Sequence, residues 1–272
     1  MGFFGKLFEK KICSVCEGEI GLLGNRKLED GNLCKECAQK LSPWFDDRRH
    51  STVEQIKAQL EYREANKEKV AAFQVTRSFG EYSKVLLDED AGVFMVTSES
   101  SPQRIAAANP DVLAFSDVTG CDLDIDESRE ELKRETNDGK EISYNPPRYR
   151  YEYDFYVKIH VRNPFFDDIQ VKLNSGTVSM EYQQGRAAGK GMGLLLGGGA
   201  QSFSPERDVE YRQYKQMGEE LKRCLMQERK AQREEAAAAA APKAAVTCPW
   251  CGATSIPDQN GCCEYCGGSV NG

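Results

Sequence analysis

The stretch YRYEYDFYVKIHV, residues 149–161, decides the fold. Aromatic and branched apolar side chains fill alternate positions in it, and mostly charged or polar residues lie between them. Because successive side chains of a β-strand point to opposite faces, this alternation predicts a long strand with one buried face. Strand signals extend from about residue 73 to residue 180, so we expect a β-rich domain there.

Neighbouring segments are expected to pair with this strand or beside it. Residues 82–87 and 93–97 flank Asp88–Gly92, whose composition is typical of a hairpin turn. Further on, Cys121, Leu123 and Ile125 alternate with three aspartates, which predicts a strand with one apolar and one acidic face. These aspartates are Asp122, Asp124 and Asp126, and we interpret them as a solvated face because calcium ligands lie in loops.

Helices are predicted on both sides of the β-rich segment. Ser51–Glu54 has capping-box spacing and starts a helix that docks by its first half, while the charged residues 61–69 continue it as a connector. Ser204-Pro205-Glu206 is a second helix start. The apolar stripe of that helix comprises Tyr214, Met217, Leu221, Cys224 and Leu225. An antiparallel sheet closed by a C-terminal helix is the arrangement of pleckstrin-homology-like domains, an analogy that carries no function by itself.

The chain holds 11 cysteines but only 2 histidines. One tetrad has the spacing C-x2-C-x17-C-x2-C, which lies within the range of structural zinc sites. A two-residue gap lets a tight turn aim two thiolates at one ion, and the second pair closes the tetrahedron. The predicted ligands of this treble-clef-like module are Cys13, Cys16, Cys34 and Cys37.

A second tetrad lies near the end of the sequence given, and a glycine follows each of its pairs. We expect a zinc ribbon in which Cys248, Cys251, Cys263 and Cys266 bind the ion. Cys262 competes with Cys263, but only Cys263 gives the two-residue gap to Cys266. Disulfides are the alternative for both tetrads, and the short gaps together with the lack of a secretory pattern favour zinc. Four thiolates leave no open position for catalysis at the metal.

Composition narrows the class of function. The 272 residues carry a formal charge of −7, so a nucleic-acid partner is not expected. His50 and His160 lie beside no recognisable nucleophile, and we expect no enzyme. An amphipathic segment at residues 1–11 and a glycine-rich segment at residues 185–200 leave a membrane-surface contact as an alternative.

The opening sequence FFGKLFEKKICSVCEGEIGLLGNRKLEDGNLCKECAQKLSPWF and the helix after it resemble a bacterial family of unknown function with an N-terminal four-cysteine zinc-binding domain. The middle of the chain resembles the pleckstrin-homology-like β domains that often follow it. The segment CPWCGATSIPDQNGCCEYCGG is similar to zinc ribbons found at the ends of many bacterial proteins. None of these resemblances implies a reaction.

The sequence therefore predicts an α+β multidomain protein with an antiparallel, pleckstrin-homology-like centre. We expect a zinc module at 1–48, a connector helix at 49–70, a β-rich domain with its helix at 71–235, an alanine-rich linker at 236–246 and a zinc ribbon at 247–272. The expected function is that of a cytoplasmic scaffold that binds two zinc ions and a protein partner. The alternative is a sensor of lipid or envelope stress at the inner face of the membrane.

Overall fold

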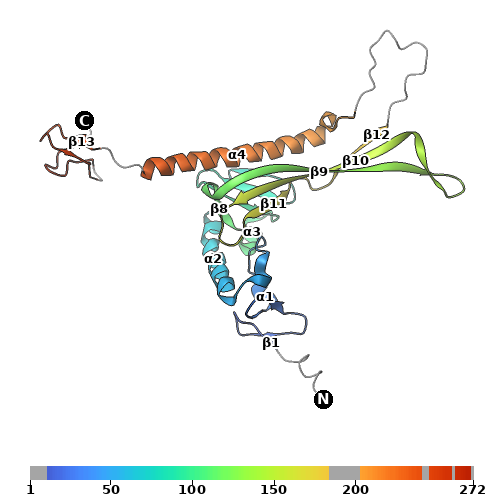
Figure 1. Cartoon of the computed structure of the whole chain (residues 1–272), viewed down its shortest axis with the longest axis horizontal. Coiled ribbons are helices and arrows are strands. Elements are labelled where there is room, and N and C mark those ends of the chain that lie inside the picture. Colours follow the sequence, from blue (N-terminus) through green and yellow to red (C-terminus); the bar gives the residue numbers. More distant parts are fainter. Residues whose placement is uncertain (1–10, 184–202, 241–244, 259–260, 271–272) are drawn as a thin grey trace, which may run out of the picture. The chain divides into compact units, whose positions relative to one another are not determined.

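A computed structural model describes residues 11–183, 203–240, 245–258 and 261–270 (Figure 1). The chain divides into two compact units, Met1–Arg229 and Lys230–Gly272. The amphipathic segment expected at residues 1–11, apart from Lys11, and the glycine-rich segment at 185–200 lie outside the described residues. Among the helices that are described, none has the length and apolar character needed to cross a bilayer.

The first unit opens with a small module built on two short hairpins. β1 (Lys11–Ile12) pairs with β2 (Glu19–Ile20), and β3 (Arg26–Lys27) pairs with β4 (Asn32–Leu33), both antiparallel. The helix α1 (Lys35–Ala38) and the 3-10 turn η2 (Asp47–His50) complete the module. Its buried core combines three cysteines with Ile20, Leu28, Leu33, Leu41 and Ile56. Ile56 comes from the next helix, so that helix is part of the module's core.

The long helix α2 (Val53–Ala72) begins one residue later than predicted. We expected Ser51 and Glu54 to form its capping box, but the reciprocal hydrogen bonds join Thr52 and Gln55. The Ser51 hydroxyl instead donates to the carbonyl oxygen of Asp47 over 2.8 Å. Because that bond holds Ser51 in the preceding turn, Thr52 takes the capping position.

The second half of α2 packs through polar side chains. Arg63 and Asn66 are buried although the surrounding sequence is mostly charged. The Asn66 amide donates to the side chain of Asn109 over 2.9 Å and accepts the backbone N–H of Val112 over 2.9 Å. These bonds join α2 to the segment that follows α3 (Pro102–Ala108), so residues 61–69 pack on the β domain as well as linking it to the module.

Two antiparallel four-stranded sheets follow. The first has the order β5 (Arg77–Phe79), β6 (Lys84–Asp88), β7 (Val93–Thr97), β8 (Val112–Ala114). The second is centred on β10 (Glu141–Val161), which pairs with β9 (Val118–Glu135) along one edge. Its other edge pairs with β11 (Asp168–Lys172) and β12 (Val178–Gln183). The predicted hairpin at residues 82–97 is confirmed as the β6–β7 pair.

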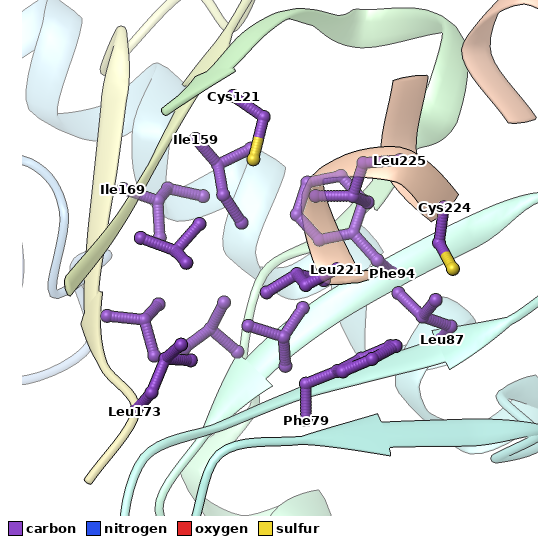
Figure 2. Packing of buried hydrophobic residues seen from close by; sticks show 14 of the residues in the cluster. Phe79, Leu87, Phe94, Cys121, Ile159, Ile169, Leu173, Leu221, Cys224 and Leu225 are labelled. Carbon is purple, nitrogen blue, oxygen red and sulfur yellow. The ribbon is translucent and has the colours of Figure 1, made fainter. Parts of the chain in front are cut away.

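The main hydrophobic core lies between the two sheets and the helix α4 (Val209–Ala240). Figure 2 shows Leu221 and Leu225 of α4 beside Phe94 of the first sheet. The predicted alternation on β10 is confirmed from Tyr153 to Val161, where the side chains at every second position are buried, whereas residues 149–152 are all half-buried. The first sheet is buried on both faces, since Leu86, Met95 and Val112 pack against Val70 of α2 on its far side. This explains why β6 carries a continuous apolar run instead of an alternation.

The helix α4 starts later and ends later than the sequence indicated. Ser204-Pro205-Glu206 leads into only a short 3-10 turn, η4 (Pro205–Arg207), and the Ser204 hydroxyl donates to the Glu206 carboxylate. The Asp208 carboxylate accepts the backbone N–H of Tyr211 over 2.9 Å, which caps α4 one turn further on. At the other end the helix continues through Ala240, into the segment predicted to be a linker, because alanine has the highest helix propensity.

The second unit ends in a small module with one short hairpin. β13 (Val246–Thr247) pairs with β14 (Thr254–Ser255), and Cys262 forms an isolated antiparallel bridge with Ser269. Its buried side chains include Cys248, Ser255 and Cys263. So few buried apolar side chains cannot by themselves offset the chain entropy lost on folding, so a metal ion is the expected source of stability.

Candidate metal centres

The first cysteine cluster brings together the four residues that the spacing singled out. Their sulfur atoms all lie within 4.8 Å of one another, and the residues are Cys13, Cys16, Cys34 and Cys37. The Sγ atoms of Cys16 and Cys34 are 3.7 Å apart. A disulfide would place them at about 2.05 Å. Zinc–sulfur bonds of about 2.3 Å in a tetrahedron require about 3.8 Å, so the arrangement fits one tetrahedral metal ion.

Local structure positions these thiols. Cys13 follows β1 in a tight turn, and Cys34 is the N-cap of α1, where its sulfur accepts the backbone N–H of Cys37 over 3.3 Å. The backbone N–H of Cys34 in turn donates to the Cys13 sulfur over 3.3 Å. Such bonds stabilise a thiolate and fix the direction in which it points.

The same contacts shift the pKa values of Cys13 and Cys37 in opposite directions. Burial raises the pKa of the Cys13 thiol, but N–H donors at Cys16, Cys34 and Val15 outweigh it and bring this pKa down to about 6. For Cys37, burial and the neighbouring thiols raise the pKa well above its ordinary value. Cys13 is therefore ready to bind a cation near neutral pH, whereas Cys37 loses its proton when the metal binds.

The second cluster repeats this geometry in the second unit. It comprises Cys248, Cys251, Cys263 and Cys266, whose sulfur atoms also lie within 4.8 Å of one another. The sulfur atoms of Cys248 and Cys266 are 3.5 Å apart, and those of Cys251 and Cys263 are 3.7 Å apart. Gly252 and Gly267, directly after the two pairs, have φ of +72° and +69°. That conformation strains side-chain-bearing residues, which explains the glycine at both places.

The structure distinguishes Cys263 from its neighbour Cys262. Cys263 is 2% exposed and its sulfur lies in the cluster. Hydrogen bonds from the backbone N–H groups of Cys266 and Tyr265 lower its pKa to about 6. Cys262 belongs to the bridge with Ser269, and its backbone N–H donates to the Asp258 carboxylate over 2.8 Å.

A cavity of about 450 Å³ opens beside the first cluster. Cys16 and Cys37 line it, together with Lys40, Arg63 and Lys67. One divalent cation held by four thiolates carries a net charge of −2. Arg63 is already paired with Asp111, and Lys67 is paired with Glu64, which also lines the cavity. Sequence reasoning did not single out Arg63 and Lys67, because they lie on α2, far from the cysteines in the sequence, and a charged helix face is usually solvated.

His160 has partners that were not visible in the sequence. Its Nδ1 lies 2.5 Å from an oxygen of Asp168, and its Nε2 lies 3.2 Å from an oxygen of Asp122. Lys158 pairs with Asp168 and Lys222 pairs with Asp122, so two cationic groups also contact these carboxylates. Asp124 and Asp126 stay exposed on β9, as expected for a solvated face.

The sequence model of a domain of unknown function (DUF4428) matches residues 11–59. This segment contains the first cysteine cluster and the first turns of α2. No curated protein and no solved structure matches the chain. The match agrees with the resemblance seen in the opening sequence in its position and in its unknown function, and it extends to neither the β domain nor the second cluster.

Proposed function

We propose that the chain is a non-enzymatic zinc-binding protein that serves as an interaction scaffold in the bacterial cytoplasm. The observation that carries the proposal is the pair of four-sulfur clusters, each with the spacing of a closed tetrahedral site. All four positions around an ion would be filled by thiolates, which leaves none for water or substrate. Zinc would therefore act as a structural ion in both modules.

The rest of the proposal follows from the class of each part. We assign the first module to the treble-clef type, the second to zinc ribbons, and the central sheets with α4 to a pleckstrin-homology-like domain. The two zinc modules would present fixed surfaces whose geometry the metal maintains. A protein partner is the expected ligand, because the net charge of −7 disfavours nucleic acid.

Elemental analysis of the full chain purified without chelator tests the metal assignment. We expect two zinc ions per chain, and one ion after Cys34→Ser or Cys263→Ser. Cys262→Ser is the matched control and should keep two. A wild-type ratio of one or lower would remove one of the modules from the proposal. For the scaffold role, a partner that co-purifies with the native chain should be lost with a single cluster variant.

A further inference from the structure

Among the residues that the structure describes, one edge of the second sheet is long and unpaired. Within the described residues, β9 pairs only with β10, so the N–H and C=O groups of its outer edge have no strand beside them. Figure 1 shows β9 and β10 running together as a long hairpin. From Asp126 to Glu135 the side chains of β9 are exposed, except the half-buried Leu132.

An unpaired edge of this kind is a template for another strand, and proteins protect such edges with charged side chains. The outer end of β9 is densely charged, with the sequence REELKRE at residues 129–135. Charged side chains would protect the edge whatever their order along the strand. The order found here has a symmetry: two positions at equal distances on either side of Leu132 always carry opposite charges.

Antiparallel pairing of this segment with a second copy of itself joins opposite charges at every charged position. With Leu132 on the two-fold axis, Glu131 lies opposite Lys133, Glu130 opposite Arg134, and Arg129 opposite Glu135. Each of these pairs occurs twice, and no like charges meet. The residue on the axis, Leu132, is the apolar one, so it contacts its own counterpart.

A competing register, centred on Glu130, is less favourable. It places two glutamates opposite each other on the axis, and like charges directly opposite destabilise a strand pair. Isologous contact about a two-fold axis is the commonest way in which identical chains associate. We propose that the chain forms a homodimer by antiparallel pairing of the 129–135 edges of two β9 strands, centred on Leu132.

Charge reversal with rescue tests the register. Arg134→Glu turns two opposite-charge pairs into like-charge pairs and should raise the dimer dissociation constant by at least about tenfold. Glu130→Arg should do the same, and the double variant should restore wild-type affinity. Within one chain, positions 130 and 134 are about 13 Å apart along the strand, so an intramolecular contact cannot produce the rescue. Glu130→Arg also removes the acidic residue opposite Arg150 on β10. Arg150 keeps its ion pair with Glu181 at 3.3 Å, so its charge stays balanced within the chain.

Sedimentation velocity of the full chain measures the dimer dissociation constant. The concentration range is about 1 µM to 1 mM, because a seven-residue pairing should give a weak dimer. Asp124→Arg is the matched control: it reverses a charge on the same strand outside the segment and should leave the constant unchanged. In a second assay, mild oxidation should cross-link two chains through Leu132→Cys but not through Ser128→Cys, with the linked peptide identified by mass.

Three results would overturn the proposal. A chain that stays monomeric throughout the range would show that the charges only protect the edge. If neither charge reversal changes the dissociation constant of the dimer, the two chains associate through another surface. Cross-linking through Glu130→Cys in place of Leu132→Cys would move the axis by two residues and exclude the register proposed.

Discussion

Arg63 donates to Asp111 over 2.9 Å, and the two side chains keep only 7% and 0% of their exposure. The same carboxylate accepts the hydroxyl of Ser42 over 2.7 Å, and Arg63 Nε donates to the carbonyl oxygen of Lys40 over 3.2 Å. Ser42 and Lys40 follow the last cysteine of the first cluster, while Asp111 precedes β8. The metal module, α2 and the first sheet therefore meet at one buried ion pair.

Removing one member of this pair should be costly. Arg63→Met leaves the Asp111 carboxylate buried without its cation, and we expect a loss of about 3–5 kcal/mol in the free energy of unfolding. Replacing both, as Arg63→Met with Asp111→Leu, removes the isolated charge and should cost far less than the sum of the single changes. Urea unfolding of the four proteins of this cycle measures the coupling. A cost below about 1 kcal/mol for Arg63→Met would contradict the buried-pair interpretation.

Loss of the first metal ion should destabilise segments outside its module as well. Cys34→Ser removes one ligand, and the module's small core should loosen as the metal is lost. Ser42 and Lys40 would then no longer hold Asp111 and Arg63, so amide exchange should accelerate in α2 and β8 as well as around the cysteines. Hydrogen exchange detected by mass spectrometry measures this. Exchange that accelerates only within residues 11–50 would show that the ion pair is independent of the metal.

The buried ion pair is also a feature that the sequence alone does not predict. The strand from Tyr153 to Val161 was predictable because burial of one face imposes a period of two. Both cysteine clusters were recognisable because their ligands come in short, regular gaps. Arg63 and Asn66 carry no such signal, since their side-chain partners Asp111 and Asn109 lie more than 40 residues away and a charged helix face is normally solvated. The predicted start of α4 was wrong for a local reason. Ser204 and Asp208 are both good capping residues, but the Ser204 hydroxyl donates to Glu206, whereas the Asp208 carboxylate accepts the backbone N–H of Tyr211.

In the second cluster, two neighbouring cysteines should behave differently. Cys263→Ser removes a buried sulfur that lies 3.7 Å from the Cys251 sulfur, so the module should lose its ion and unfold. Cys262→Ser should keep the metal, because the contacts of Cys262 with Ser269 and Asp258 involve its backbone. Zinc content and the fluorescence of Trp250, whose indole donates to the Ser269 carbonyl oxygen, report the two states. Equal zinc loss in both variants would refute the ligand assignment.

The ion pairs around His160 should make a small contribution to stability that depends on pH. Hydrogen bonds from Lys158 and then His160 hold the pKa of Asp168 below its ordinary value. A carboxyl group with a depressed folded-state pKa stabilises the fold above its unfolded pKa of about 3.9, and the contribution disappears as the pH falls through the folded value. Because Asp168 is 44% exposed, solvent screening limits the contribution to at most about 1 kcal/mol.

The melting temperature of Asp168→Asn should therefore be slightly below that of the wild-type chain at pH 7. The difference should shrink as the pH falls through the lowered pKa of Asp168 towards pH 2.5. Comparing the two chains at each pH cancels the loss of metal that acid causes in both. The matched control is Asp167→Asn, at the adjacent exposed carboxylate, whose side chain makes no ion pair among the described residues. It should leave the melting temperature unchanged at both pH values. A difference for Asp168→Asn that persists at pH 2.5 would mean that the side chain acts through its shape and not through its charge.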